Sequence, residues 1–164
     1  MKTLIIYISI HHSNTEKVAK VMAEVLNAKL VKLYEVDTTT LSKYDLVGFG
    51  SGIYFGKHHK SLLNLIDRLP MQKAKKAFVF STSGMRNGIA QRPYGGDFNK
   101  PLREKLLGKG FNIIGEFSCR GFDTYGPFKL IGGISKGRPS EKDLGKVKNF
   151  VQELLVKLSA VYGN

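Results

Sequence analysis

The sequence contains no tryptophan and only one cysteine, Cys119. A single cysteine cannot form a disulfide within the chain, so packing has to hold the fold, and the composition is typical of a reducing compartment. No apolar run approaches the roughly 20 residues that a membrane-spanning helix requires. An apolar strand pattern begins at Thr3 with no signal-peptide pattern before it. We therefore expect a cytoplasmic protein without a membrane span.

Acidic residues are also scarce, because 13 Asp and Glu stand against 26 Lys and Arg, which gives a formal net charge of +13. The basic residues are spread along the chain and form no dense tail, which argues against a dedicated nucleic-acid-binding arm. A positive surface of this kind attracts acidic partners and binds nucleic acids only weakly and without specificity. The charge therefore favours partners with an acidic docking face.

Apolar runs and amphipathic patterns alternate along the 164 residues without a linker or an internal repeat. Mostly continuous apolar runs favour five buried strands, at residues 3–9, 28–33, 46–50, 77–82 and 111–118. Helical spacing favours helices from residue 14 or 15 onward and at residues 59–69, 101–107 and 141–158. This alternation predicts a single α/β domain over residues 1–164, built on a doubly wound parallel sheet of five strands with helices on both faces.

A polar turn connects the first predicted strand to the first predicted helix. The first N–H groups of a helix have no partner within it, and the peptide dipoles place partial positive charge there, so backbone alone can hold a phosphate. Six side chains of the turn add possible donors: Ser9, His11, His12, Ser13, Asn14 and Thr15. Two simpler interpretations stay open, namely ordinary capping of the helix by Asn14 and a pair of solvated loop histidines.

Three further loops follow predicted strands, at residues 50–57, 81–88 and 119–128. In a doubly wound sheet, ligands bind outside the carboxyl ends of the strands, where these loops lie. Their glycines, such as Gly50, let the backbone approach a ligand, and their aromatic residues offer flat faces for stacking. Together with the polar turn, they indicate a site for a planar ring with a phosphate tail.

Three motifs resemble the flavodoxin family. Residues 11–15 (His-His-Ser-Asn-Thr) are similar to its phosphate loop, which usually ends in Gly-Asn-Thr, although Ser13 stands where the family has glycine. Residues 50–57 (Gly-Ser-Gly-Ile-Tyr-Phe-Gly-Lys) and 118–127 (Ser-Cys-Arg-Gly-Phe-Asp-Thr-Tyr-Gly-Pro) resemble a flavodoxin-like branch more specifically. The resemblance covers nearly the whole chain, except that residues 86–98 match no pattern of that branch.

This resemblance implies a flavodoxin fold with strand order 2-1-3-4-5 and noncovalent binding of FMN. It places the phosphate at Ser9, His11, His12, Ser13, Asn14 and Thr15. It places one side of the flavin ring at Ser51, Gly52, Ile53, Tyr54, Phe55 and Gly56, and the other side at Thr82, Ser83, Gly84 and Met85. We expect Tyr54 or Phe55 to stack on the ring, and we assign no catalytic residue and no metal ligand.

Two functions fit such a site. The first is an electron carrier that shuttles electrons between redox proteins, with the chemistry supplied by the flavin. The second is an FMN-dependent oxidoreductase of the quinone reductase or protoporphyrinogen oxidase type, because residues 50–59 also resemble a loop of flavodoxin-like protoporphyrinogen oxidases. A P-loop nucleotide enzyme is disfavoured, since no Gly-x-x-x-x-Gly-Lys-Ser/Thr turn follows the first strand.

The remaining expectations concern single residues near this site. Cys119 is interpreted as a small core residue and not as a nucleophile, because a lone cysteine at a strand end usually packs. Four arginines fall in loops that we place near the flavin, at positions Arg86, Arg92, Arg120 and Arg138. They are expected to make the surroundings of the flavin more positive than in an acidic flavodoxin.

Overall fold

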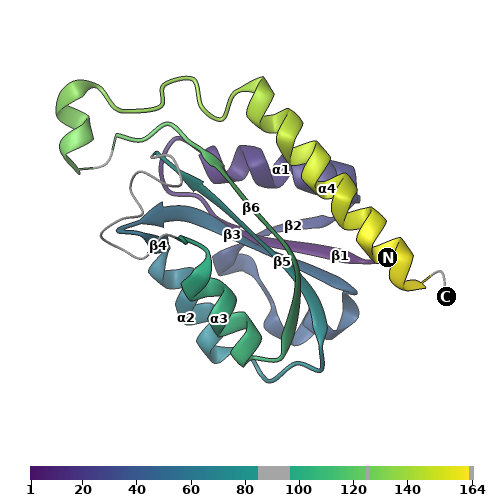
Figure 1. Ribbon diagram of the computed structural model, residues 1–164. Coiled ribbons are helices and arrows are strands. Elements are labelled where there is room, and N and C mark those ends of the chain that lie inside the picture. Colours follow the sequence, from purple (N-terminus) through teal and green to yellow (C-terminus); the bar gives the residue numbers. More distant parts are fainter. Residues whose placement is uncertain (85–96, 125, 163–164) are drawn as a thin grey trace.

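A parallel β-sheet runs through the centre of the molecule, with helices on both of its faces (Figure 1). The computed structural model describes residues 1–84, 97–124 and 126–162. Five parallel strands form the main sheet in the order β2-β1-β3-β5-β6, which confirms the predicted fold class and strand order. Their bounds are Thr3–Ile8 for β1, Lys29–Lys32 for β2, Leu46–Tyr54 for β3, Lys75–Ser83 for β5 and Phe111–Arg120 for β6.

In the described part of the chain, four helices cover the sheet, two on each face (Figure 1). One face carries α1 (Asn14–Leu26) and α4 (Glu141–Tyr162), and the other carries α2 (Lys60–Arg68) and α3 (Lys100–Gly108). Between β2 and β3 the chain forms only two 3-10 segments, η1 (Leu33–Glu35) and η2 (Thr38–Lys43). A third, η3 (Gly126–Ile131), lies in the long connection from β6 to α4.

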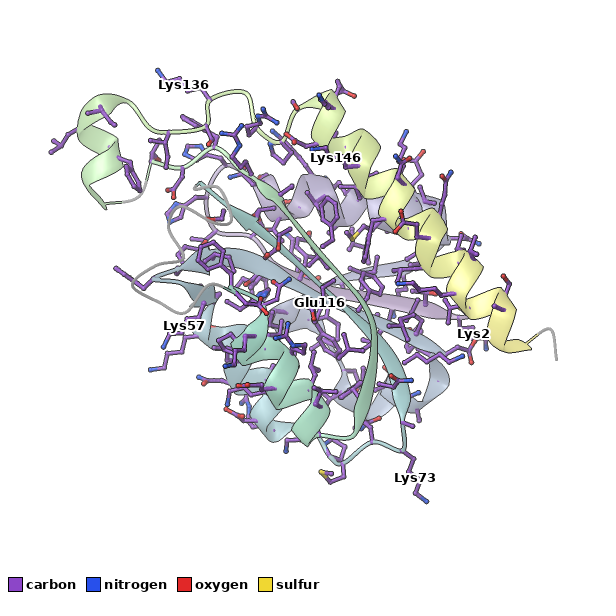
Figure 2. All side chains as sticks on the ribbon, in the orientation of Figure 1. Lys2, Lys57, Lys73, Glu116, Lys136 and Lys146 are labelled. Atoms are coloured by element: carbon purple, nitrogen blue, oxygen red, sulfur yellow. The ribbon has the colours of Figure 1, made fainter. Side chains whose placement is uncertain are left out.

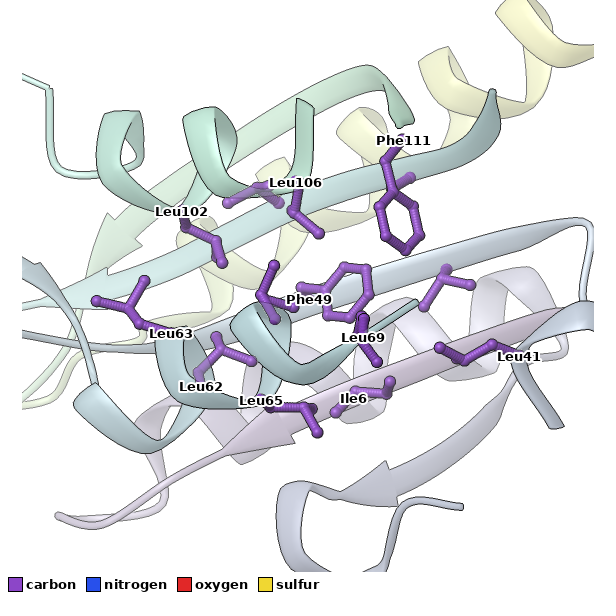
Figure 3. Packing of buried hydrophobic residues seen from close by; sticks show 14 of the residues in the cluster. Ile6, Leu41, Phe49, Leu62, Leu63, Leu65, Leu69, Leu102, Leu106 and Phe111 are labelled. Carbon is purple, nitrogen blue, oxygen red and sulfur yellow. The ribbon is translucent and has the colours of Figure 1, made fainter. Parts of the chain in front are cut away.

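Side chains alternate between the two faces of each central strand, as strand geometry requires. On the α2/α3 face, Phe49 of β3 lies among leucines of both helices, and its ring meets Phe111 edge to face at 5.5 Å (Figure 3). Its neighbours Gly48 and Gly50 face α1 and α4, where the rings of two β5 phenylalanines occupy the space that a Cβ would need. The absence of a side chain at Gly50 therefore serves core packing, because the Phe80 ring fills that space.

Three strands extend further toward their carboxyl ends than the apolar runs predict. β3 continues to Tyr54 because it pairs with an additional two-residue strand, β4 (Lys57–His58), which runs antiparallel to it. The intervening Phe55 and Gly56 have φ angles of 50° and 78°, the left-handed values that a two-residue hairpin turn requires at both positions. Residues predicted as a ligand loop thus form the β3–β4 hairpin, a more rigid structure than a loop.

Candidate functional site

The turn between β1 and α1 has an unusual backbone conformation in the two residues that precede the helix. His12 and Ser13 both adopt left-handed conformations, with φ of 54° and 52°. Ser13 occupies the N-cap position but makes no side-chain capping bond, and its carbonyl accepts the N–H of Lys17 at 2.9 Å. Left-handed backbone is costly for a residue with a Cβ, which explains why glycine is usual at the position of Ser13.

Asn14 and His12 bond to the segment that follows β6. The Asn14 amide donates to the carbonyl oxygen of Phe122 at 2.6 Å, so the interpretation of Asn14 as an ordinary helix cap is wrong. His12 Nε2 lies 2.8 Å from Thr124 Oγ1, and its ring packs against Phe122 with centroids 4.4 Å apart. His12 is exposed, as the simpler interpretation expected, but these contacts hold its ring in place.

Two buried polar atoms of the turn, Ser9 Oγ and Asn14 Oδ1, have no hydrogen-bond partner among the residues that the structure describes. Leaving a buried polar atom unsatisfied costs about 1–3 kcal/mol, so such atoms usually have a role. Both lie in the segment expected to hold a phosphate. A bound group with oxygens and hydroxyls would satisfy them, because a serine hydroxyl donates to a phosphate and an amide oxygen accepts from a hydroxyl.

The carboxyl end of β5 reaches the same turn. The hydroxyls of Thr15 and Thr82 are hydrogen-bonded at 2.9 Å, and both residues are buried. Beyond Thr82, Gly84 lies against Asp123 so closely that a Cβ on Gly84 would overlap the aspartate side chain, and Gly121 lies against Asn14 in the same way. The turn, the end of β5 and the segment after β6 therefore meet at one place.

The β3–β4 hairpin forms a further side of this region. Tyr54 is half-buried, with its ring 5.3 Å from that of His59 in an edge-on contact and 6.2 Å from that of His11. Phe55, at the tip of the hairpin, is 74% exposed. Thus the hairpin and the polar turn approach each other through Tyr54 and His11, two residues from separate predicted motifs.

A chain of buried hydrogen bonds anchors the hairpin to the rest of the sheet. Ser51 Oγ lies 2.9 Å from Nδ1 of His58, and Nε2 of His58 lies 3.0 Å from Oδ1 of Asn99. The Asn99 amide donates to Ser118 Oγ at 3.3 Å, and the hydroxyls of Ser118 and Ser81 are 2.7 Å apart. Burial lowers the pKa of His58 to about 4, so the imidazole is neutral at pH 7.

Asn99 and Ser118 are not among the site residues predicted from the sequence. A signal for Ser118 is present, because Ser118 begins the motif at residues 118–127 that resembles the flavodoxin-like branch. Asn99 has no comparable signal, since it follows a long irregular connection. Of the sixteen predicted site residues, Met85 lies outside the described residues.

Comparison with known proteins identifies the family. The sequence profile of the flavodoxin domain, Flavodoxin_5, matches residues 4–116. The chain belongs to the flavodoxin family. A relative from Methanocaldococcus jannaschii, "Uncharacterized protein MJ0298", is 50% identical over 155 residues, which cover 94% of this chain and 99% of the relative.

Two solved structures place this flavodoxin among proteins of the same fold. Oxidised flavodoxin 1 from Bacillus cereus has 19% identity and a TM-score of 0.66, with 94% of this chain and 97% of that chain covered. Rubredoxin oxygen:oxidoreductase from Desulfovibrio gigas has 20% identity and a TM-score of 0.65, with 97% of this chain but only 36% of that chain covered. The fold therefore occurs both alone and as a part of a larger chain.

Cys119 of this flavodoxin lies at the end of β6, next to the site. Burial raises the pKa of its thiol to about 12, and the Asp143 carboxylate adds to the shift. The thiolate is the reactive form, so this cysteine is inert near pH 7. Within the described residues, no group of three or more His, Cys, Asp or Glu could hold a metal ion, and no helix is long and apolar enough to cross a membrane.

Proposed function

We propose that this flavodoxin binds FMN noncovalently and carries electrons between redox proteins of the cytoplasm. The proposal rests on two buried atoms, Ser9 Oγ and Asn14 Oδ1, at the turn into α1, which no residue in the described part of the chain satisfies. When bound, FMN supplies the electron-transfer chemistry, and the protein supplies binding, orientation and local charge. The polar turn and the β3–β4 hairpin of this chain are suited to binding and orienting such a cofactor.

The phosphate is assigned to the polar turn. Ser9 offers a hydroxyl donor, and the left-handed conformation of His12 and Ser13 leads the backbone into the first turn of α1, whose N–H groups favour an anion. Thr15 is held by Thr82 but retains bonding capacity, because one hydroxyl of the pair donates to the other and the acceptor keeps its own hydrogen. The turn is thus prepared for an anion before it binds.

The flavin ring is assigned to the space between the β3–β4 hairpin and the end of β5, at Ser51–Gly56 and Thr82–Met85. Tyr54 and Phe55 are the proposed stacking residues on the hairpin side. The hairpin is fixed at its base by the buried bonds of Ser51 and His58, which supports a role in holding a ring in one orientation. Rigid positioning of this kind is what a cofactor site requires from its surroundings.

The state of two titratable groups near the site fits an electron carrier and gives no support to an oxidoreductase that would use them. Burial keeps His58 neutral and Cys119 protonated near pH 7, so neither is available to transfer a proton or to attack a substrate. An electron carrier needs neither activity. Its partners are proposed to present an acidic face, in keeping with the net charge of +13.

Calorimetric titration of the apo-protein with FMN and with riboflavin tests the cofactor assignment. Bonds to a charged group contribute about 1.5–3 kcal/mol each, so several of them predict FMN binding at least about 100-fold tighter than riboflavin binding. Ser9→Ala is expected to weaken FMN about tenfold and to leave riboflavin unchanged. Ser159→Ala, on the exposed side of α4, is the matched control. Equal affinity for the two flavins would contradict the phosphate assignment.

A second measurement separates the carrier from the enzyme. The FMN-loaded protein is mixed with NADH or NADPH and a soluble quinone, and nicotinamide oxidation is followed by absorbance. A carrier is expected to show no catalytic turnover in this assay and to exchange electrons with redox proteins after reduction by dithionite. Sustained nicotinamide oxidation would instead identify an FMN-dependent oxidoreductase.

A further inference from the structure

The connection between β6 and α4, residues 121–140, projects beyond the carboxyl edge of the sheet and carries η3 (Figure 1). We call this segment the arm. Its base is tied together by paired backbone bonds, in which the N–H of Asp123 donates to Ile134 O at 3.0 Å and the N–H of Ile134 donates to Asp123 O at 2.8 Å. Ser135 Oγ donates to the carbonyl of Gly84 at 2.8 Å. The arm is therefore a built structure and is anchored to the candidate site.

The far part of the arm exposes two adjacent apolar side chains. Leu130 is 89% exposed and Ile131 is 69% exposed, although both belong to residue types that are usually buried. Elsewhere at the same edge of the sheet, Ile10 follows β1 and Phe55 follows β3, and both are more than half exposed. Adjacent exposed apolar side chains such as Leu130 and Ile131 favour an interaction surface.

The charge of the arm is mainly positive. The arm contains three basic residues, Lys129, Lys136 and Arg138, and one acidic residue, Asp123, which lies at its base. Arg138 is neutralised by two bonds to Asp143, at 2.7 and 2.6 Å. Lys129 and Lys136 are exposed and form no ion pair with any residue that the structure describes. The arm therefore presents two apolar side chains together with two positive charges.

This surface lies on the same side of the molecule as the β3–β4 hairpin, as the positions of Lys136 and Lys57 in Figure 2 show. The chain termini and Lys73 lie elsewhere, away from this side (Figures 1 and 2). A partner that contacts the arm would consequently lie close to the carboxyl edge of the sheet, where the proposed flavin site is. Electron transfer requires that the partner lie close to the flavin. A docking surface at another edge of the molecule would not bring the partner close to it.

We infer that the arm is a docking surface for an acidic electron-transfer protein. Leu130 and Ile131 enter an apolar depression on this partner, and Lys129 and Lys136 face its carboxylates. The inference rests on the proposed electron-carrier function and specifies where its partner binds. A second copy of the chain is a poor occupant, because two molecules of charge +13 repel each other.

Stopped-flow electron transfer tests this docking surface. The FMN-loaded protein, reduced by dithionite, gives one electron to an acceptor, so that ferric haem becomes ferrous or benzoquinone becomes its semiquinone. The acceptors are the soluble domain of cytochrome b5, which is acidic, cytochrome c, which is basic, and 1,4-benzoquinone, which is neutral. The variants are Lys129→Glu/Lys136→Glu and Leu130→Ser/Ile131→Ser. The control is Lys73→Glu/Lys157→Glu, which changes the net charge equally at two exposed lysines outside the arm.

The docking surface predicts that both arm variants slow the second-order reaction with cytochrome b5 at least tenfold at low salt. The lysine variant is also expected to speed the reaction with cytochrome c. The control changes either rate less than threefold, and no variant changes the rate with benzoquinone. Equal effects of the arm and control variants would show that only net charge matters and would overturn the inference.

Two further measurements distinguish a failure of the docking inference from a failure of the proposed electron-carrier function. In the first, cytochrome b5 is added to the isotope-labelled protein and the chemical-shift changes are mapped. This mapping needs no flavin, so it reports on the arm even if FMN does not bind. Chemical-shift changes confined to residues outside the arm would overturn the inference. Co-sedimentation with phosphatidylglycerol vesicles tests the other occupant of an apolar, basic tip. If the arm variants abolish vesicle binding but leave the electron-transfer rates with cytochrome b5 unchanged, the arm binds a membrane surface and the inference is overturned.

Discussion

At the scale of single residues, His58 is the least expected feature of this flavodoxin. It is buried, it has both ring nitrogens in hydrogen bonds, and it connects the hairpin to Asn99. Nε2 donates to the Asn99 oxygen, because an amide oxygen only accepts, while Nδ1 lies 2.9 Å from the Ser51 hydroxyl. Protonation would place a charge in the core, which burial disfavours.

His58 predicts a pH-dependent stability. Its pKa is 6.5 when unfolded and about 4 when folded, so the unfolded chain binds more protons between these values. Stability is therefore complete above pH 6.5 and falls by on the order of 3 kcal/mol as pH decreases to 4. Urea unfolding of the apo-protein at several pH values measures this loss.

The variant His58→Gln is expected to flatten the stability profile between pH 6.5 and 4. His59→Gln is the control, because His59 is only half-buried and burial lowers its pKa in the same direction. Burial opposes the shift at Asp143, but its bonds to Arg138 and Ser140 lower its pKa overall. Asp143 therefore reduces the stability only when the pH falls below its ordinary pKa of 3.8, outside the range of this test. A profile unchanged by His58→Gln would show that other groups cause the acid sensitivity.

At the scale of elements, the candidate site depends on how closely the β1–α1 turn and the end of β6 approach each other. The contact consists of the Asn14 amide against Gly121 and the bond from Asn14 to the Phe122 carbonyl. A Cβ on Gly121 would lie 2.7 to 2.9 Å from the Asn14 side chain, too near for two packed atoms. The absence of a side chain at Gly121 is thus a condition for the observed position of Asn14.

Gly121→Ala is therefore expected to displace Asn14 and to weaken FMN binding about tenfold or more. The stability of the apo-protein should fall by about 1–3 kcal/mol, the usual cost of overpacking. Gly145→Ala in α4 is the matched control, since nothing lies within 4 Å of its added Cβ. It should leave FMN affinity unchanged and raise stability by about 0.5–1 kcal/mol, because alanine favours a helix over glycine. Equal FMN affinity of the two variants, measured by calorimetry, would contradict this account.

At the scale of the whole molecule, the positive charge is distributed less simply than the sequence suggests. Of the four arginines expected near the flavin, Arg138 is paired with Asp143, and Arg86 and Arg92 lie outside the described residues. Arg120 remains at the end of β6. The excess of 13 positive charges still gives the molecule a positive field, which stabilises the negative charge that reduction adds.

The FMN-loaded protein is therefore expected to have a one-electron reduction potential less negative than that of an acidic flavodoxin. One charge at roughly 8 Å and an effective dielectric constant of about 20 contributes about 2 kcal/mol, or roughly 90 mV, before screening. The potential should become more negative as salt screens the positive field. Spectroelectrochemical titration at two ionic strengths measures both. A strongly negative potential that does not respond to salt would show that the positive charge lies far from the flavin.

The order of the elements and the position of the polar turn between β1 and α1 could be predicted from the sequence. Buried strands and amphipathic helices depend on periodicity within short segments, which is a local property of the chain. The turn at residues 9–15 could be predicted in the same way, because the strand, the polar residues and the helix follow one another directly in the sequence. Neighbouring residues that act together in one backbone segment leave a pattern that can be recognised.

Only the tertiary structure decided which distant residues meet. The Thr15–Thr82 bond, the His12–Thr124 bond and the buried bonds of His58 each join residues from separate elements, and no local pattern specifies the distance between them. The length of β3 has the same origin, since its last residues are strand only because β4 pairs with them. Hydrogen bonds between elements depend on the register and packing of the whole sheet, and these arise only when the complete chain has folded.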